Sequence, residues 1–164
     1  MACIKLALIF SAWPLAIACD SRPRMSAATL VWIDLEMTGL EPETCGIVEM
    51  ALILTDGELN EIADPLEMAI WQPPTVLENM SPFVRSMHDK SGLLEKVRAS
   101  KTSVGDAEIK DLELVSKHAS FRKARLCGNS VSQDRRFLSK YMPLLEGYLH
   151  YRQGDVSSVK ELAG

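Results

Sequence analysis

Two carboxylates one residue apart, Asp34 and Glu36, are the side chains of this sequence with the clearest chemical potential. They follow the apolar residues 30–33, which predict a buried strand. Residues i and i+2 of a strand project to the same face, so the two acids are expected to converge where this strand leaves its sheet. Two like charges there are unfavourable unless they are protonated or neutralised. A hard divalent ion such as Mg²⁺, held by carboxylates and substrate phosphates, would neutralise them, and a solvated strand end is the alternative.

A third acid, Asp134, is predicted at the start of a helix. Residues 125–128 are typical of a short strand, and the chain then passes through Gly128-Asn129-Ser130 into a helix over about 132–146. Asp134 falls in the first turn of that helix, where the helix dipole favours an acid with or without a metal. The pattern alone leaves both readings of Asp134 open.

Five stretches of the chain, in a fixed order, resemble the motifs of the oligoribonuclease family of DEDD-type 3'-to-5' exonucleases. They are residues 31–40, residues 47–51, His88 with residues 91–93, residues 128–138, and residues 150–152 with 155–157 and 160–162. The resemblance covers about residues 29–163. It implies an α/β ribonuclease-H-like exonuclease fold, with a mixed sheet of about five strands flanked by helices and incomplete at the C-terminus.

The resemblance assigns Asp34, Glu36 and Asp134 as catalytic metal ligands. Two Mg²⁺ or Mn²⁺ ions are expected, one activating the attacking water and the other stabilising the leaving 3' oxygen. Carboxylate oxygens are the ligands that these hard ions prefer.

The same resemblance implies six substrate-binding residues. Leu40 would insert between bases, Phe83 would stack where relatives usually carry Trp, and His88 would help to position the substrate. Ser130, Tyr151 and Arg152 match positions that hold the terminal phosphate, the last two across the interface of a homodimer. Core packing is the alternative for Phe83 and Tyr151, and a solvated surface charge is the alternative for Arg152.

The sequence departs from the family in its third motif, a His followed five residues later by an Asp. That motif is expected some thirty residues beyond the stretch Lys160-Glu161-Leu162, whereas the sequence ends at Gly164. The His serves as general base and the Asp as a fourth metal carboxylate. His150 and Asp155 have a similar spacing, but they belong to the His-Tyr-Arg segment that relatives possess in addition, so we interpret them as unrelated to that motif.

Two functional hypotheses follow. The first is a hydrolase that trims short single-stranded RNA, two to five nucleotides long in the family's usual substrate class, to nucleoside 5'-monophosphates. The second is a truncated, catalytically impaired relative that binds metal or short nucleotides, or pairs with a full-length partner. A secreted binding module is a third reading, which rests only on the first residues of the chain.

Composition and charge are compatible with these hypotheses. The chain has 164 residues, 47% of them hydrophobic, enough for one core. Its net charge of −4 argues against a long binding track for duplex nucleic acid, which needs many contacts from Lys and Arg to phosphate. The four cysteines show no C-x-x-C spacing, so a zinc site is not indicated.

Residues 1–28 are expected to be a leader that precedes an exonuclease domain over residues 29–164. Lys5 precedes an apolar stretch over residues 6–19, and Arg22 and Arg24 follow it. A secretory signal peptide, a mitochondrial presequence and a segment without any address all fit this pattern. The stretch is too short to span a membrane, so no stable membrane association is expected. The domain is placed inside the cell, in mitochondria or cytoplasm, unless the leader is a signal peptide.

The elements that must position the candidate site alternate between strands and helices. Strands are predicted over 29–36, 47–55, 60–71, 125–128 and 151–156, the first three as an antiparallel meander with a turn at residues 55–58. Helices are predicted over about 75–80, 91–99, 104–117 and 132–146. The third of these starts at Ser103, with Asp106 three residues on, as in a capping box.

Overall fold

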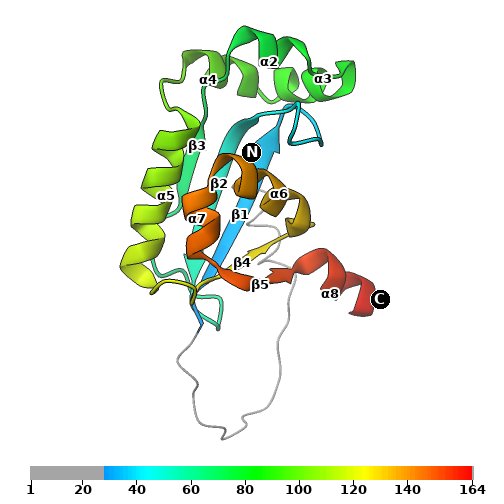
Figure 1. Ribbon diagram of the computed structural model, residues 1–164. Helices are drawn as coiled ribbons and strands as arrows, with labels where there is room; N and C mark the ends of the chain where they lie inside the picture. Colours follow the sequence, from blue (N-terminus) through cyan, green and yellow to red (C-terminus); the bar gives the residue numbers. More distant parts are fainter. Residues whose placement is uncertain (1–27, 164) are drawn as a thin grey trace, which may run out of the picture.

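A mixed five-stranded sheet organises the computed structural model, which describes residues 28–163 (Figure 1). The strands are β1 (Leu30–Met37), β2 (Ile47–Thr55), β3 (Leu66–Ala69), β4 (Arg125–Gly128) and β5 (His150–Asp155). Their order across the sheet is β3-β2-β1-β4-β5. The first three strands form the predicted antiparallel meander, while β4 and β5 run parallel to β1. The expected mixed-sheet α/β architecture is therefore confirmed.

The apolar runs of the sequence form the middle of the sheet. β2 lies between β3 and β1 and is buried at all nine of its positions. Its register places Glu36 of β1 opposite Glu49, and a bulge follows between Glu36 and Met37. A bulge bends a strand and redirects the side chains beside it. Asp34 and Glu36 therefore lie where β1 departs from regular pairing.

Seven helices are described in residues 28–163. They are α2 (Pro74–Glu78), α3 (Pro82–Lys90), α4 (Leu93–Ala99), α5 (Val104–His118), α6 (Val131–Tyr141), α7 (Pro143–Tyr148) and α8 (Val156–Ala163). In Figure 1, α2, α3 and α4 gather beyond the end at which β1 finishes, while α5, α6 and α7 lie along the sheet. The main core fills the space between these last three helices and the sheet, with fully buried residues such as Ile33, Leu52 and Phe137. The predicted capping box of α5 is confirmed, since Ser103 Oγ accepts from the Asp106 N–H at 3.1 Å and Asp106 Oδ2 accepts from the Ser103 N–H at 3.1 Å.

The helix predicted over 132–146 is in fact two helices. α6 ends at Tyr141 and α7 begins at Pro143. Proline lacks the backbone N–H that a continuous helix needs, and it fits well in the first turn of a new one. Two further helices, α3 and α8, were not predicted at all.

The strand predicted over 60–71 is wrong in length, because only Leu66–Ala69 forms β3. Asp56 Oδ1 accepts from the N–H groups of Glu58 and Asn60, which keeps the chain in a turn after β2. A single bridge between Thr55 and Glu61 continues the pairing there, and Pro65 then precedes the strand. Proline cannot donate to a ladder, so regular pairing resumes only after it.

Gly154 lies in β5, where glycine would ordinarily weaken a strand. A Cβ atom added at this position would lie 2.9 Å from Cys127 Sγ of the neighbouring strand. The close approach of β4 and β5 therefore depends on the missing side chain.

In the described part of the chain, none of the helices combines the length and the apolar character that a membrane crossing requires.

Candidate active site

Asp134 lies against the strand that carries the other two acids. Its Oδ1 accepts a hydrogen bond from the backbone N–H of Leu35 at 3.1 Å. Leu35 stands between Asp34 and Glu36, so an acid almost one hundred residues away along the chain is brought to the predicted pair. The three acids that the sequence singled out thus share one end of β1.

The short length of β4 makes room for this contact. β4 pairs only with Leu30, Val31 and Trp32 of β1, so the second half of β1 has no described strand on that side. The chain turns away just after Gly128, where an added Cβ would lie 2.8 Å from the carbonyl oxygen of Ile33. Ser130 then adopts the left-handed conformation, with φ 55°, and α6 starts at Val131. This turn brings the first turn of α6, and with it Asp134, beside Leu35.

Asp134 is electrostatically coupled to its two neighbours. Asp134 is only 6% exposed, and this burial raises its pKa to about 7. The charges of Asp34 and Glu36 raise the pKa further, whereas the bond from the Leu35 N–H opposes the rise. A carboxyl that is buried beside two others needs either a proton or a cation, which is the condition that a metal site sets.

A fourth acid, Glu49, lies directly across the strand pair from Glu36. It is buried, and this burial is the main cause that raises its pKa. The half-exposed Lys96 of α4 approaches it, with Nζ 3.8 Å from Glu49 Oε1 and 3.8 Å from Glu67 Oε1. Glu49 thus adds negative charge beside the trio, and Lys96 compensates part of it.

The donor set suits a hard divalent ion, since Asp34, Glu36 and Asp134 offer only carboxylate oxygens. No group of three or more His, Cys, Asp and Glu side chains within residues 28–163 is already drawn together in a metal-binding arrangement. The three acids therefore share a strand end and an electrostatic environment, and a bound ion would have to draw their oxygens closer.

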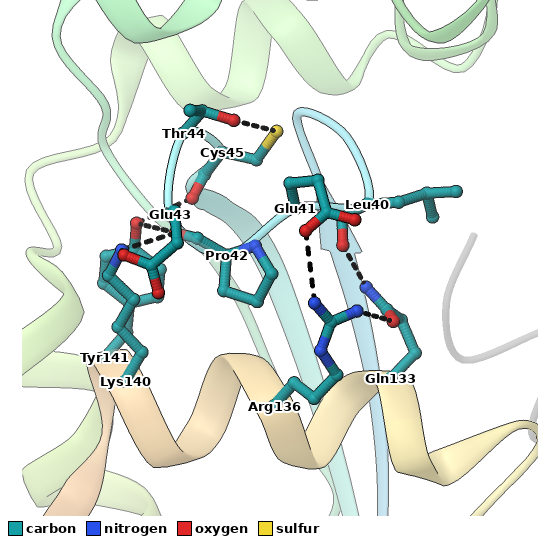
Figure 2. A network of polar contacts seen from close by, with 10 residues as sticks. All are labelled: Leu40, Glu41, Pro42, Glu43, Thr44, Cys45, Gln133, Arg136, Lys140 and Tyr141. Atoms are coloured by element: carbon teal, nitrogen blue, oxygen red, sulfur yellow. Dashed lines mark hydrogen bonds and ion pairs between the residues drawn. The ribbon is translucent and has the colours of Figure 1, made fainter.

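Leu40 and Phe83 are strongly exposed apolar side chains. Leu40 is 71% exposed in the loop after β1, and Phe83 is 79% exposed at the start of α3. In Figure 2 the Leu40 side chain points away from α6, while its carbonyl oxygen faces Gln133. Neither side chain is packed in the core, so the packing alternative for Phe83 does not apply in this structure.

His88 is in a different environment from the one expected of a substrate contact. It is 1% exposed, and its Nε2 lies 2.9 Å from the carbonyl oxygen of Met37. A carbonyl only accepts, so Nε2 carries the proton and donates it. This hydrogen bond connects α3 to Met37, the last residue of β1, which follows Glu36 in the sequence.

Ser130 belongs to a polar network between the starts of α6 and α8. Its N–H lies 3.0 Å from Asp155 Oδ1 and 3.1 Å from Ser157 Oγ, and the hydroxyls of Ser130 and Ser157 are 3.0 Å apart. The Ser157 hydroxyl donates to Asn129 Oδ1 at 2.9 Å. The network places the hydroxyl groups of Ser130 and Ser157 next to each other, just beyond the end of β4.

Tyr151 and Arg152 lie away from the three acids of their own chain. The register runs from Leu30 to Arg125 to His150, whereas Glu36 stands six residues further along β1, roughly 20 Å at the usual rise of a strand. Tyr151 is 65% exposed on the edge strand, and its hydroxyl accepts from Arg152 Nε at 3.0 Å. Arg135 of α6 holds this segment through the carbonyl oxygen of Tyr151.

His150 and Asp155 stand at opposite ends of β5. His150 Nδ1 accepts from the Arg152 N–H at 3.0 Å, and Asp155 Oδ1 accepts from the N–H groups of Ser130 and Ser157. The two side chains therefore have separate partners, as the interpretation of this pair as unrelated to the third motif requires.

Comparison with known proteins assigns the family. The RNase_T family model, described as an exonuclease, matches residues 31–164. The oligoribonuclease of Thiobacillus denitrificans is 48% identical over 134 residues, which are 82% of this chain and 74% of the relative. The oligoribonuclease of Marinobacter nauticus is 52% identical over the same shares of both chains. This chain belongs to the oligoribonuclease family. It is thereby placed among the hydrolytic 3'-to-5' exoribonucleases.

Solved structures extend this oligoribonuclease-family assignment at the level of the fold. A product-bound exonuclease I has a TM-score of 0.63 and 18% identity, covering 84% of this chain and 32% of its own. The Escherichia coli exonuclease I solved with a dT13 oligonucleotide has a TM-score of 0.63 and 19% identity, covering 83% and 29%. The exonuclease fold expected from the sequence is therefore confirmed.

Sequence reasoning missed two groups of residues around this oligoribonuclease-type site. Glu49 lies within a matched stretch, but only the pairing of β1 with β2 shows that it faces Glu36. The α6 side chains that bind the loop after β1 were not singled out either, because their partners lie more than ninety residues away. The spacing of Gln133, Arg136 and Lys140, three and four residues apart on one face of α6, is the signal that could have indicated these contacts.

Proposed function

We propose that this chain hydrolyses short oligoribonucleotides from the 3' end to nucleoside 5'-monophosphates, with divalent metal ions bound by Asp34, Glu36 and Asp134. The observation that carries the proposal is the bond from the Leu35 N–H to Asp134, which joins the third acid to the strand of the other two. Family membership supplies the class of reaction, and this contact supports the choice of residues.

The three acids provide the charge that the chemistry needs. Two Mg²⁺ or Mn²⁺ ions, when bound there, would supply an activated water and neutralise charge on the scissile phosphate and the leaving oxygen. The pKa of Asp134, about 7, means that its carboxyl is partly protonated at neutral pH without an ion. Replacing that proton by a cation satisfies the buried carboxyl without changing its bond to Leu35.

The surroundings of the acids favour a short, single-stranded substrate. Leu40 and Phe83 offer exposed apolar surface to nucleobases, and base stacking on such side chains tolerates any sequence. The net charge of −4 provides no extended cationic track, so affinity has to come from the metal ions and a few base contacts. A substrate of a few nucleotides meets both conditions. His88, buried against Met37, would act on the substrate indirectly, through the position of α3.

We infer that the functional unit is a homodimer. Tyr151 and Arg152 are exposed, and their register separates them from the acids of the same chain. A guanidinium and a phenol that are already joined by a hydrogen bond can bind a terminal phosphate of the substrate held by a second copy. Ser130 would meet the same phosphate from the chain that supplies the acids.

A catalytically weak, binding-only relative is the second candidate. The three described histidines have other positions, because His88 Nε2 donates to Met37, His150 Nδ1 accepts from Arg152 and His118 ends α5. A site without a histidine base would still bind metal and nucleotides. Its turnover rate would be lower by about 10²- to 10⁴-fold than that of a site with a general base.

The decisive experiment is a hydrolysis assay of the purified chain with a 5'-labelled dinucleotide and a 5'-labelled pentanucleotide in Mg²⁺. The proposal expects stepwise shortening from the 3' end, release of 5'-monophosphates and complete inhibition by a chelator. Asp34→Asn should abolish turnover, while Glu113→Gln, which changes an exposed acid on α5, should not. Tight binding without turnover would favour the second candidate, and neither binding nor turnover would contradict both.

The cellular address of the chain remains a prediction, since residues 1–27 lie outside the described residues. The relatives reported above are bacterial and give no support to a mitochondrial address. Fusion of residues 1–28 to a fluorescent reporter would distinguish secretion, import into mitochondria and a segment without an address.

A further inference from the structure

The loop between β1 and β2 is bound along most of its length to one face of α6 (Figure 2). Residues 40–45 of this loop face four side chains of the helix: Gln133, Arg136, Lys140 and Tyr141. Their spacing of three, four and one residues is that of a single helical face. We call them the loop-binding face.

The first half of the loop is held through Gln133. Its side-chain Nε2 donates to the carbonyl oxygen of Leu40, and its Oε1 accepts from Arg136 Nη1 at 2.9 Å. Arg136 Nη2 in turn lies 3.2 Å from Glu41 Oε2. The amide of Gln133 thus connects the backbone of Leu40 to an ion pair on the next residue.

The second half of the loop is held separately. Lys140 Nζ donates to the Pro42 carbonyl oxygen at 2.9 Å and pairs with Glu43 Oε2 at 2.9 Å. The Tyr141 hydroxyl lies 2.8 Å from the Pro42 carbonyl oxygen and 2.7 Å from that of Cys45, and it has one proton to share between them. These bonds fix the return of the chain to β2 without contacting Leu40.

The same helix turn therefore locates two parts of the site. Asp134 accepts from the Leu35 N–H on β1, while its neighbour Gln133 donates to Leu40. Leu40 itself is exposed and has little packing to hold it, so its position in the loop after β1 depends on its backbone. The Gln133 bond is exposed as well, and an exposed hydrogen bond adds little to stability.

We infer that Gln133 is a positioning residue, whose side-chain amide sets the place of Leu40 relative to the three acids and thereby determines how the first two bases of the substrate are separated. This inference rests on the proposed function, since it takes Leu40 as the side chain that enters between bases. Gln133 acts through Leu40 and makes no contact with the reacting atoms.

The test compares Gln133→Met with Ser139→Ala in the full chain. Methionine keeps the length and helix propensity of glutamine but removes both of its hydrogen bonds. Ser139 is exposed on the same helix, and among residues 28–163 its hydroxyl bonds only to the Arg135 carbonyl oxygen within α6, so it is the matched control. Both variants should keep the unfolding temperature of the wild type.

The first readout needs no ligand. Hydrogen exchange of the free chain should be faster by at least threefold over residues 38–43 in Gln133→Met, and unchanged in Ser139→Ala and over β2. Equal exchange in Gln133→Met and the wild type would overturn the inference.

The second readout uses a dinucleotide of 2-aminopurine and adenine, bound in Ca²⁺ so that it is not cleaved. Separation of the two bases raises the fluorescence of 2-aminopurine. The rise at saturation should be large in the wild type, at least halved in Gln133→Met, and small and equal in Leu40→Ala and in the Leu40→Ala, Gln133→Met double variant. A full rise in Gln133→Met would overturn the inference even if exchange became faster.

These outcomes also separate the inference from the function on which it rests. A wild-type chain that binds the dinucleotide, together with a Gln133→Met chain that gives the full signal, contradicts only the role of Gln133. A wild-type chain that does not bind the dinucleotide contradicts the proposed function and removes the positioning role with it.

Discussion

Asp134 is located by the backbone of Leu35, whose N–H donates to its Oδ1 at 3.1 Å. The contact depends on a main-chain group of β1, which cannot be lost by substitution of a neighbouring side chain. The charges of Asp34 and Glu36 act on the pKa of the same carboxyl. Position and charge at this residue can therefore be tested separately.

Asp134→Asn should remove the charge and keep the acceptor for Leu35. We expect turnover of a dinucleotide to fall by at least about 10²-fold, since a metal carboxylate is lost, while the free energy of unfolding of the metal-free chain at pH 8 stays equal or rises. Initial rates and urea unfolding curves measure the two effects. Asp134→Leu, which cannot accept from Leu35, should lose stability as well, and turnover near the wild-type rate in either variant would contradict the assignment.

Divalent ions should stabilise the folded chain. An ion that binds only the folded state adds about 2.7 kcal/mol at a concentration one hundred times its Kd, and a chelator should reverse the effect. Thermal unfolding with Mg²⁺, Mn²⁺ and EDTA checks this for the wild type. The shift should disappear in an Asp34→Asn, Glu36→Gln double variant and remain in Glu113→Gln, and a shift of equal size in all three would place the ion elsewhere.

Asp111 of α5 predicts a stability that depends on pH. It is fully buried, neither of its oxygens has a hydrogen-bond partner among the described residues, and burial raises its pKa from 3.8 to about 7, with a small opposing effect of Lys110. A carboxyl with a higher pKa in the folded state binds its proton more tightly there. Its stabilising contribution is therefore complete below about pH 4 and is lost as the pH rises through about 7.

Asp111→Leu should remove this dependence, because leucine has a similar volume and no charge to bury. The gain in unfolding free energy over the wild type should be small at pH 4 and reach about 1–3 kcal/mol at pH 8. Asp134 adds a dependence of the same sign in both proteins, so the difference between variant and wild type is the quantity to compare. A difference that does not change between pH 4 and pH 8 would show that Asp111 has the same pKa in the folded and the unfolded chain, and would contradict the prediction.

Mixed dimers test the role of Arg152 across an interface. A chain with Asp134→Asn and a chain with Arg152→Ala should each be nearly inactive alone. If Arg152 serves the site of the partner, a dimer of one copy of each contains one intact site, and mixing after mild denaturation should restore activity to about a quarter of the wild type in a statistical mixture. No restoration would show that Arg152 acts in its own chain or not at all.

Local sequence patterns predicted the parts of the fold that depend on local chemistry. The apolar runs of β1 and β2 and the capping box of α5 reflect burial and hydrogen bonds within a few residues, and all three are confirmed. α3 was missed even though Ser81 followed by Pro82 is a favourable helix start, with Ser81 Oγ accepting from the Val84 N–H at 3.3 Å. The division of α6 from α7 at Pro143 was likewise visible in the sequence and was not used.

The sequence singled out the three acids of the candidate site but not the contacts that bring them together. Asp34 and Glu36 are two residues apart, so strand periodicity alone places them together. The contact of Asp134 with Leu35 spans 99 residues, and that of Gln133 with Leu40 spans 93. Such contacts depend on where β4 ends and how α6 crosses the sheet, which no local pattern records.

The short β4 strand has a consequence for how this domain tolerates change. Because β4 stops opposite Trp32, the second half of β1 is supported on one side by β2 and on the other by the start of α6. The cooperative unit that resists unfolding is therefore centred on β1, β2 and the buried core, and the exposed residues 129 and 130 lie at its margin. Substitutions at these two positions should be recovered more readily in a screen for folded protein than substitutions at the buried Val131, so a comparison of that screen with one for catalysis would trace the boundary between scaffold and active centre.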